Sequence, residues 1–359
     1  MISDITNHCI APSSSIRHAM GCINSYASTP IVLVVDEEYR LLDTITDGDI
    51  RRAILAGLDL DGPVSVLKSR KVNSPYPQPV TASASTDSAA LLRLMQEHSV
   101  RQVPLLDERK RVVGLMSLRD LLPSETLSLQ AVVMAGGYGT RLRPLTENMP
   151  KPMLPIGDRP LLELIISQLS YTGIRRINLT THYKGDLIAQ HFGDGKNFGV
   201  EIRYVEESQP LGTAGSLSLL DAPNEPLLVM NGDILTQVDF RAMFDFHQEH
   251  QAAMTVAVRQ YDFQVPYGVL ECEGYKVRQI REKPTYNFFV NAGIYLLEPE
   301  LHCYVPNNQR FDMTDLIEIL ISQGKTVISF PILEYWLDIG QHADYEQAQL
   351  DMKEGRFSS

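Results

Sequence analysis

The chain has 359 residues and a formal net charge of −12. Hydrophobic residues make up 44% of it and charged residues 21%, a composition typical of a globular protein with room for two or three domains. The acidic balance argues against general binding of nucleic acid or of anionic membranes, for which a basic surface is needed.

The chain shows no pattern of a secreted or membrane protein. Its four cysteines have no metal-binding spacing and are expected to be reduced thiols. The sequence contains neither a signal-peptide pattern nor an apolar run of about 18 residues. We therefore expect a cytoplasmic protein that binds neither nucleic acid nor membrane.

Residues 1–125 contain an internal repeat, which is aligned by placing Asp36 on Asp107. Segment 34–55 then overlies 105–126, with five coincident apolar pairs and the matches Arg40/Arg111 and Asp49/Asp120. Each copy reads as strand, charged turn, strand and helix, and is preceded by a helix with a Ser or Thr cap. The predicted leading helices span 15–25 and 86–97, a proline-rich connector spans 73–79, and the predicted domains are 1–66 and 67–125.

The repeat resembles a pair of cystathionine-β-synthase-type (CBS) domains, which commonly form one regulatory module and dimerise. The resemblance implies an adenine-nucleotide site for AMP, ADP or ATP, formed by a Thr/Ser-x-x-Asp at the second strand–helix junction. It also implies a homo-oligomer. The candidate residues are Thr46, Asp49, Ser117 and Asp120. The same motif is also an ordinary helix cap that needs no ligand.

Residues 130–359 alternate between apolar strands and helices, which predicts an α/β domain with a doubly wound, mostly parallel sheet. Strands predominate after residue 250, so a more antiparallel half should follow the nucleotide-binding half. The predicted strands are 131–135, 177–181, 200–205, 227–231, 253–258, 267–272, 275–280, 290–297 and 326–330. The predicted helices are 161–171, 186–192, 213–220, 240–250, 314–323 and 341–352.

The stretch 131–155 is a strand that leads into a glycine-rich turn followed by Arg141, Arg143 and Lys151. Glycines allow backbone N–H groups to converge on phosphate oxygens, and the cations neutralise the phosphate charge. The stretch therefore predicts a polyphosphate site.

Several motifs over residues 131–345 together resemble the sugar-1-phosphate nucleotidyltransferases that make nucleotide sugars. The general texture is similar to the GDP-mannose and heptose guanylyltransferases. With the CBS pair, it resembles the glucosamine-1-phosphate guanylyltransferase of legionaminic acid synthesis, an enzyme of bacterial surface glycans. The matching motifs are GGYGTRLRPLT (136–146), PKPMLP (150–155), QPLGTAG (209–215), NGD (231–233), EKP (282–284), NAGIY (291–295) and WLDIG (336–340).

The resemblance implies a Rossmann-like nucleotide-diphospho-sugar transferase fold and assigns roles to single residues. The implied catalytic residues are Arg141, Lys151, Asp233 and Lys283, and Asp233 and Asp338 would hold Mg²⁺. The implied nucleotide-binding residues are Ala135, Gly136, Gly137, Gly139, Thr140, Arg141, Glu206, Glu207, Gly212 and Thr213. The implied sugar-phosphate residues are Gly268, Glu282, Lys283, Asn291 and Gly293.

Structural alternatives stand beside these roles. Asp233 could belong to a plain turn and Asp338 could cap the last helix, while Glu282 and Lys283 could form a surface ion pair. His182, His191 and His247 show no ligand spacing and are interpreted as structural or surface residues.

The predicted reaction transfers a nucleoside monophosphate from a triphosphate to a hexose- or amino-hexose-1-phosphate and releases pyrophosphate. GTP is favoured, because a carboxylate such as Glu206 or Glu207 accepts both guanine donors. The alternatives are a uridylyl or thymidylyl transferase, and a sensor that binds nucleotide sugar without reacting. Acetyl transfer is not expected, since the chain ends soon after Asp338.

Overall fold

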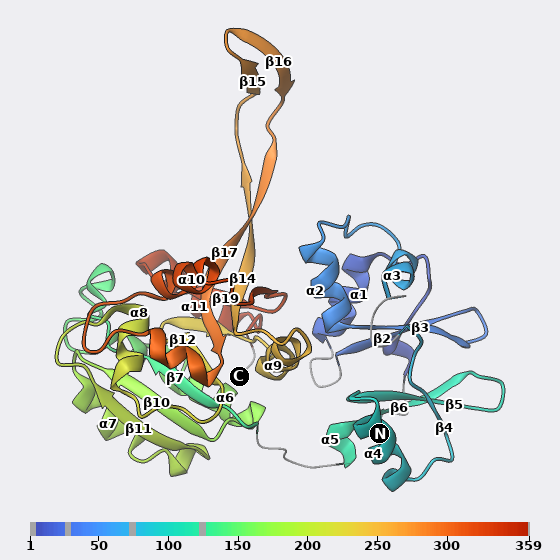
Figure 1. The fold of residues 1–359 in the computed structure, drawn as a ribbon, viewed down its shortest axis with the longest axis horizontal. Helices are drawn as coiled ribbons and strands as arrows, with labels where there is room; N and C mark the ends of the chain where they lie inside the picture. The colour runs from blue at the N-terminus through green and yellow to red at the C-terminus, as the bar shows by residue number, and fades with distance from the viewer. Residues whose placement is uncertain (1–4, 26–29, 72–76, 122–126, 358–359) are drawn as a thin grey trace. The chain divides into compact units, whose positions relative to one another are not determined.

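The computed structural model describes residues 5–25, 30–71, 77–121 and 127–357. They form two compact units, Met1–Leu127 and Ser128–Ser359, which are considered separately (Figure 1). Part of the predicted connector 73–79 and most of the second copy's last helix lie outside the described residues. Within the described ranges, no helix is long and apolar enough to cross a bilayer.

The first unit contains two three-stranded sheets of identical design, which confirms the predicted repeat. In each sheet the short first strand pairs parallel with the second, and the second pairs antiparallel with the third. The strands are β1 (Cys9–Ile10), β2 (Ile31–Val35), β3 (Leu41–Thr46), β4 (Ala82–Ser83), β5 (Gln102–Leu106) and β6 (Val112–Ser117). The helices are η1 (Thr6–His8), α1 (Ile16–Ser25), α2 (Asp47–Leu55), α3 (Ser65–Arg70), α4 (Ser88–Glu97) and α5 (Leu118–Leu121).

The charged turn has the same hydrogen bonds in both copies. The carboxylate of Asp36 accepts from the backbone N–H and the Nε of Arg40, and Asp107 accepts the same pair of bonds from Arg111. Arg40 and Arg111 also face each other in an antiparallel bridge. The turns of the two copies therefore join them, and the apolar cluster beneath combines β2 residues such as Leu33 with Leu115 of β6.

One predicted helix cap is wrong. The helix α4 is capped by Asp87, whose side chain accepts from the N–H of Ala90, and not by Thr86. In α1 the predicted cap is confirmed, since the N–H of His18 donates to Ser15 Oγ. Asp and Thr are both good N-caps, so adjacent candidates cannot be separated by residue type.

A buried ion cluster fastens the end of α3 to the first copy. Lys71 Nζ lies 2.9 Å from an oxygen of Asp49 and 3.5 Å from Asp43, and the Asp49 carboxylate also pairs with Arg52. Burial, the largest single effect, would raise the pKa of Asp49, but Lys71, the N–H of Thr46 and Arg52 together outweigh it and hold the pKa below its ordinary value. The predicted boundary at 66/67 falls inside α3. Lys71, the residue after this helix, forms its ion pairs with aspartates of the first copy.

We expect Lys71→Met to lower the free energy of unfolding of the first unit by about 3 kcal/mol, because it leaves buried carboxylates without their cation. The stability contributed by Asp49 is present above its unfolded pKa of about 4 and is lost as pH falls through the lower folded pKa. In the variant, burial raises that pKa, so the acid loss begins at higher pH. Urea unfolding followed by circular dichroism across pH 3–7 measures both effects.

Trp336, the only tryptophan, reports on the second unit alone and serves as an internal reference. Lys68→Met is the matched control, since Lys68 is an exposed lysine on the same helix. An unchanged dichroism transition in Lys71→Met would contradict the structural role given to this cluster.

The second unit is built on a seven-stranded sheet in the order β11-β10-β7-β12-β17-β14-β18, which confirms the predicted α/β class. The strands β11, β10, β7 and β12 are parallel, whereas β17 runs antiparallel to both of its neighbours. The sheet strands are β7 (Gln130–Met134), β10 (Arg176–Thr181), β11 (Glu201–Glu206), β12 (Leu227–Asn231), β14 (Met254–Gln264), β17 (Thr285–Leu297) and β18 (Val327–Pro331).

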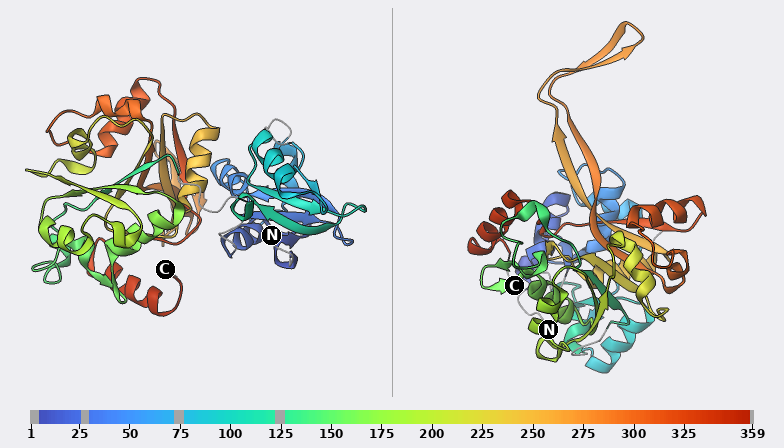
Figure 2. Two further views of the ribbon diagram at one scale, coloured as in Figure 1. Left: turned by 90° about the horizontal axis from the view of Figure 1, so that it is seen from below. Right: turned by 90° about the vertical axis from the view of Figure 1, so that its left-hand side faces the viewer.

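Helices lie on both faces of this sheet (Figure 2), and the unit also contains three small two-stranded pairs. The helices are α6 (Leu161–Thr172), α7 (Gly185–Phe192), α8 (Gly212–Gly215), α9 (Phe240–Glu249), α10 (Met313–Ser322) and α11 (His342–Lys353). The short pairs are β8 (Pro155–Ile156) with β9 (Arg159–Pro160), β13 (Ile234–Thr236) with β19 (Trp336–Asp338), and β15 (Val269–Glu273) with β16 (Lys276–Arg281). The short 3-10 helices are η3 (Thr140–Leu142), η4 (Lys151–Met153), η5 (Lys196–Phe198), η6 (Ser216–Leu219) and η7 (Pro299–Tyr304).

Two predictions for this unit need correction. The helix expected at 213–220 is the single turn α8 followed by η6, because Gly212 and Gly215 pack against the backbone of residues 309–311. The strands expected at 253–258 and 290–297 are longer: β14 and β17 continue as a paired ribbon to Gln264 and Thr285. The β13–β19 pair was not predicted.

Candidate active site

The carboxyl ends of four parallel strands meet at one edge of the sheet and collect most of the predicted nucleotide residues. After β7 comes the glycine turn, after β10 comes His182, after β11 comes Glu207, and after β12 comes Asp233. Hydrogen bonds between successive exits hold this edge together, from Ala135 N to Thr180 O at 2.9 Å and from Gly232 N to Met134 O at 2.9 Å. Ligands of open α/β sheets bind at such edges.

The glycine turn is shaped by contacts that leave little room for side chains. Gly139 has φ 61°, and a Cβ there would lie 2.9 Å from Thr146 Cγ2 and 3.1 Å from Lys151 Cβ. The hydroxyl of Thr146 donates to the carbonyl of Gly139 at 2.7 Å. Thr140 and Arg141 begin η3 directly after this residue and are exposed. The turn thus holds its shape without a ligand and presents Arg141 to solvent.

Lys151 and Asp233, 82 residues apart, form an ion pair with Nζ and Oδ2 separated by 2.5 Å. Lys151 is buried, and Asp233 follows the end of β12. The other oxygen of Asp233, Oδ1, is buried and has no hydrogen-bond partner among the described residues. An unsatisfied buried carboxylate oxygen is costly, so it indicates a group that is completed by something bound.

Asp338 is brought to Asp233 by the β13–β19 pair. In that pair Ile234 lies opposite Asp338, and Ile339 N donates to the carbonyl of Asp233 at 3.0 Å. Partial desolvation, and then the charge of Asp233, raise the pKa of Asp338 above its ordinary value. The charges of Lys151 and Arg141 lower the pKa of Asp338 and so oppose this shift, because both cations lie near that carboxylate.

The two carboxylates fit a Mg²⁺ ion. Magnesium prefers hard oxygen ligands and commonly takes one or two carboxylates, with water and substrate phosphates completing its shell. Oδ1 of Asp233 has no hydrogen-bond partner among the described residues, and Asp338 lies alongside it, so the pair offers oxygens of the kind that this ion takes. Within the described ranges no cluster of three or more His, Cys, Asp or Glu side chains could hold a metal ion.

Glu207 is buried and acts within the fold. Its Oε2 accepts from the N–H of Leu211 at 3.1 Å, and its Oε1 lies 3.3 Å from the Cβ position of Gly136. Glu206 is exposed at the end of β11. The buried carboxylate therefore organises the turn before Gly212, and the exposed one is open to solvent.

His182, interpreted from the sequence as a structural or surface residue, has structural contacts at this edge. Its ring lies between the Tyr138 hydroxyl, 2.8 Å from Nε2, and the carbonyl of Glu207, 2.7 Å from Nδ1. The Tyr138 and His182 rings meet edge to face beside Gly136. The place of His182 in the sequence, directly after β10, puts it at the same edge of the sheet as the glycine turn.

Gly212 and Thr213 are held by a distant segment. The N–H of Thr213 donates to Asp312 Oδ1 at 2.9 Å, and its hydroxyl accepts from the N–H of Met313 at 2.9 Å. Gly212 has φ 81°, and a Cβ there would lie 2.5 Å from Asp312 Oδ1. Thr213 is thus hydrogen-bonded to Asp312, the N-cap of α10, and to the first residue of that helix.

The predicted sugar residues are divided between two places. Gly293, with φ 70°, packs against the amide of Asn231, and Asn291 Oδ1 accepts from the N–H of Gly293 at 3.0 Å. These two lie at the edge described above. Gly268, Glu282 and Lys283 lie beyond the ends of β14 and β17, where the ribbon projects from the sheet (Figures 1 and 2). The structure does not bring these three to the aspartates.

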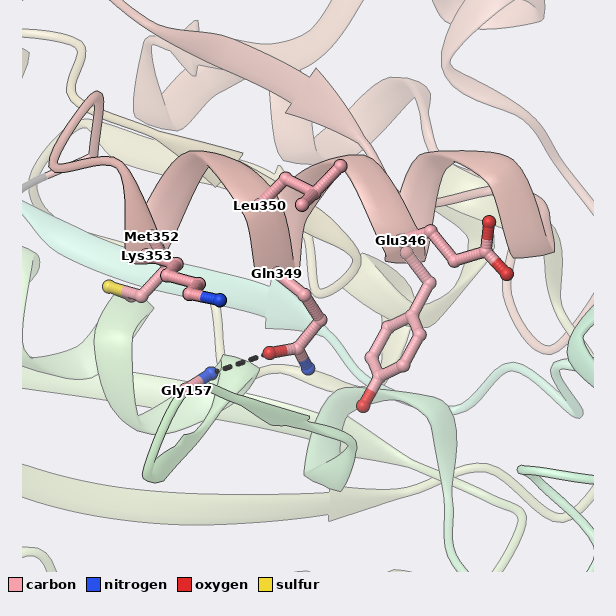
Figure 3. A pocket seen from close by; sticks show the side chains of 7 residues that line it. Gly157, Glu346, Gln349, Leu350, Met352 and Lys353 are labelled. Carbon is pink, nitrogen blue, oxygen red and sulfur yellow. Dashed lines mark hydrogen bonds between the residues drawn. The ribbon is translucent and has the colours of Figure 1, made fainter.

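A cavity of about 560 Å³ lies under α11 and is separate from the predicted residues (Figure 3). Its polar groups are used in packing: Gln349 Oε1 accepts from Gly157 N at 3.0 Å, and the hydroxyl of Tyr345 donates to the carbonyl of Pro155 at 2.7 Å. The helix also reaches the glycine turn, since His342 Nε2 lies 2.8 Å from the carbonyl of Arg143. We interpret the cavity as part of the seating of α11.

At the first CBS junction, Thr46 and Asp49 form a reciprocal capping box in which the Thr46 N–H donates to Asp49 Oδ2 at 2.9 Å. Asp49 also carries the ion pairs with Lys71 and Arg52. At the second junction the N–H of Ser117 donates to Asp120 Oδ2 at 3.0 Å. Both motifs therefore act as helix caps, the alternative that the sequence left open.

We expect Gly139→Ala to destabilise the second unit by about 1–3 kcal/mol, because it combines positive φ with contacts to Thr146 and Lys151. Urea unfolding followed by the fluorescence of Trp336 measures this. Gly137→Ala is the matched control, since nothing lies within 4 Å of its Cβ position, and it should stay within about 0.5 kcal/mol of wild type. Equal stability of the two variants would contradict the close packing of this turn.

Comparison with known proteins agrees with this geometry. The chain is 33% identical over 228 residues to a mannose-1-phosphate guanyltransferase of Kluyveromyces lactis, covering 60% of this chain and 63% of the relative. It is 33% identical over 239 residues to a mannose-1-phosphate guanylyltransferase of Mycobacterium tuberculosis, covering 64% and 66%. The chain thus spans less than two thirds of the length of these relatives.

Among solved structures, a "Putative Glucose-1-Phosphate Thymidylyltransferase" from Bacillus anthracis matches with a TM-score of 0.52 and 24% identity, covering 64% of this chain and 98% of that one. This likeness shows the fold. Residues 1–56 and 72–124 match the CBS domain model, and residues 130–355 match the nucleotidyl transferase model. The chain therefore belongs to the nucleotidyl transferase family and carries a CBS pair ahead of its transferase domain.

Proposed function

We propose that this protein transfers a nucleoside monophosphate from a nucleoside triphosphate to a sugar-1-phosphate and releases pyrophosphate. The observation that carries the proposal is the state of Asp233. One of its oxygens is paired with Lys151, and the other is buried without a hydrogen bond next to Asp338. A glycine turn that bears Arg141 lies beside this pair, as a triphosphate requires.

The main obstacle in this reaction is that two polyanions must meet. A sugar-phosphate oxygen attacks the α-phosphorus in line, the bond to the leaving phosphate breaks, and charge develops on pyrophosphate. The protein needs no nucleophile, so positioning and electrostatics supply the catalysis. Arg141 would stabilise the leaving group, Lys151 would lie near the α-phosphate, and Lys283 would bind the incoming sugar phosphate.

Mg²⁺ is part of the proposal, with Asp233 and Asp338 as its protein ligands. When bound, the ion would neutralise phosphate charge that the two acids by themselves would repel. The ion pair with Lys151 would orient the carboxylate of Asp233.

GTP is the proposed triphosphate, and mannose-1-phosphate is the first sugar to test, since the relatives at 33% identity are mannose-1-phosphate guanylyltransferases. The exposed Glu206 is the carboxylate proposed to accept the guanine donors. Glu207, which bonds Leu211, would support the turn behind it. A uridylyl or thymidylyl transferase is the alternative within the same fold.

We expect release of pyrophosphate from GTP with a hexose-1-phosphate, dependent on Mg²⁺ and abolished by EDTA. Asp233→Asn should lower kcat/KM by at least about 100-fold, because it removes a charged ligand and the partner of Lys151. The measurement is a matrix of four triphosphates against mannose-, glucose- and glucosamine-1-phosphate.

Asp221→Asn makes the same chemical change at an exposed carboxylate and should leave the rate unchanged. Activity with UTP or dTTP in place of GTP would select the other transferase. If wild type and Asp233→Asn are equally silent for every pair, the protein is a sensor and the catalytic proposal fails.

For the CBS pair we propose binding of an adenine nucleotide. At the first junction the ligand would have to displace Lys71 from Asp49, since that carboxylate is already paired. AMP, ADP or ATP at about 100 times its dissociation constant should add about 2.7 kcal/mol to the stability of the first unit. Calorimetry of the full chain measures this, with Asp233→Asn as the background that removes metal-assisted binding at the transferase site. No shift with any of the three nucleotides would overturn the proposal.

A further inference from the structure

The feature that the proposed function does not explain is the ribbon formed by residues 259–290, which we call the arm. Six consecutive pairs, from Arg259 opposite Val290 to Gln264 opposite Thr285, extend β14 and β17 beyond the sheet. The hairpin β15–β16 forms its tip (Figures 1 and 2). Nearly every residue from Gln260 to Phe289 is exposed.

The arm is amphipathic. Tyr261 lies opposite Phe288 and Phe263 lies opposite Tyr286, and because side chains alternate along a strand, these four aromatics share one face. The other face is mainly polar, with Asp262 opposite Asn287 and Gln264 opposite Thr285, and its single aromatic is Phe289 opposite Gln260 near the base. Tyr261, Phe263 and Phe288 are each at least half exposed.

The tip continues this design. Leu270 lies opposite Ile280 and Cys272 lies opposite Val277, which places apolar side chains together, and Leu270, Val277 and Ile280 are all more than half exposed. A two-stranded ribbon alone in water is marginally stable, and contiguous exposed apolar surface marks an interaction site. The arm therefore needs a surface to cover its aromatic face.

The joint between ribbon and tip carries the predicted sugar-phosphate residues. Lys283 has φ 43° and is exposed, and no carboxylate of the described residues lies within ion-pair distance of its Nζ. The two arginines of the tip are paired locally, Arg281 with Glu271 at 2.9 Å and Arg278 with Glu273, whereas no ion pair of Lys276 or Lys283 is found among the described residues. Lys283 is thus an exposed cation at the joint.

Lys283 lies far from the aspartates of its own chain. Asn291, at the base of the arm, is six residues from Thr285, a distance of about 20 Å along a strand at 3.3 Å per residue. The intact ladder from 259/290 to 264/285 keeps the joint at that distance. Bending at the joint alone would not place Lys283 beside Asp233, and folding the arm back would break paired backbone groups.

We infer that the arm docks on a second copy of this chain and supplies Lys283 to that copy's transferase site, while the second copy's arm does the same in return. The inference rests on the proposed function of Lys283 as the ligand of the sugar phosphate. A second copy is the occupant that explains both observations, since it covers the aromatic face and completes a site that is otherwise without this cation. Such reciprocity is the geometry of a two-fold dimer.

The test is complementation between two inactive chains. Full-length Lys283→Ala and Asp233→Ala carry different affinity tags, are co-expressed, and the mixed species is isolated by tandem purification. Each homomer should be at least about 100-fold slower than wild type in pyrophosphate release. In the mixed dimer one site combines an intact Asp233 with an intact Lys283 from the partner, so about half the wild-type rate should return.

Three results would overturn the inference: a mixed species no faster than either homomer, a Lys283→Ala homomer with the wild-type rate, or failure to obtain any mixed species. If the wild type releases no pyrophosphate with any substrate pair, the proposed function is refuted instead. Docking of the arm is then tested by the mass of the protein in solution.

Light scattering at micromolar concentration supplies that second measurement. Phe263→Glu places a charge on the aromatic face and should convert the dimer to monomer, whereas Gln264→Glu, one residue along on the polar face, should leave the mass unchanged. A wild-type monomer, or equal masses for the two variants, would overturn docking through the arm.

Discussion

The contact between Lys151 and Asp233 is the interaction around which the transferase unit is arranged. One carboxylate oxygen neutralises a buried lysine, and the other remains buried without a hydrogen bond. Three separate constraints maintain this state. Gly139 packs against the Cβ of Lys151, Gly232 lets the chain after β12 cross the end of β7, and the β13–β19 pair places Asp338 alongside. The fold thus holds two like charges together, and a divalent cation would offset their repulsion.

The same residue types serve folding in the first unit. Asp49 is as acidic and as buried as a ligand residue would be, yet its oxygens are taken by Lys71, Arg52 and its own helix cap. The contrast with Asp233 is informative, because both aspartates follow a strand and both face a lysine. The two aspartates differ in the partners of their carboxylate oxygens. Both oxygens of Asp49 have a partner, whereas Oδ1 of Asp233 has none among the described residues.

The arm changes how the site is to be understood. In the sheet, β17 brings Asn291 and Gly293 to the edge where Asp233 lies, but the same strand continues outward and carries Lys283 away. Residues that belong to one motif series in sequence are therefore separated in space by the length of a paired ribbon. An amphipathic ribbon cannot bury its aromatic face by itself. Under the inference drawn above, the partner chain that covers this face is also the chain whose site Lys283 completes.

The sequence by itself determined the repeat, the α/β class, the glycine turn after β7 and the identity of the acids and cations around it. These follow from local chemistry: hydrophobic period, glycine in tight turns and the charge of each side chain. Helix 213–220 could not be predicted correctly, since Gly212 and Gly215 are held by residues almost 100 positions away. The partners of His182 and Lys71 could not be predicted either, because these residues contact segments distant in sequence. Only the tertiary structure decided which oxygen of Asp233 is free and that Lys283 stands on an arm, because both depend on strand pairing between distant segments.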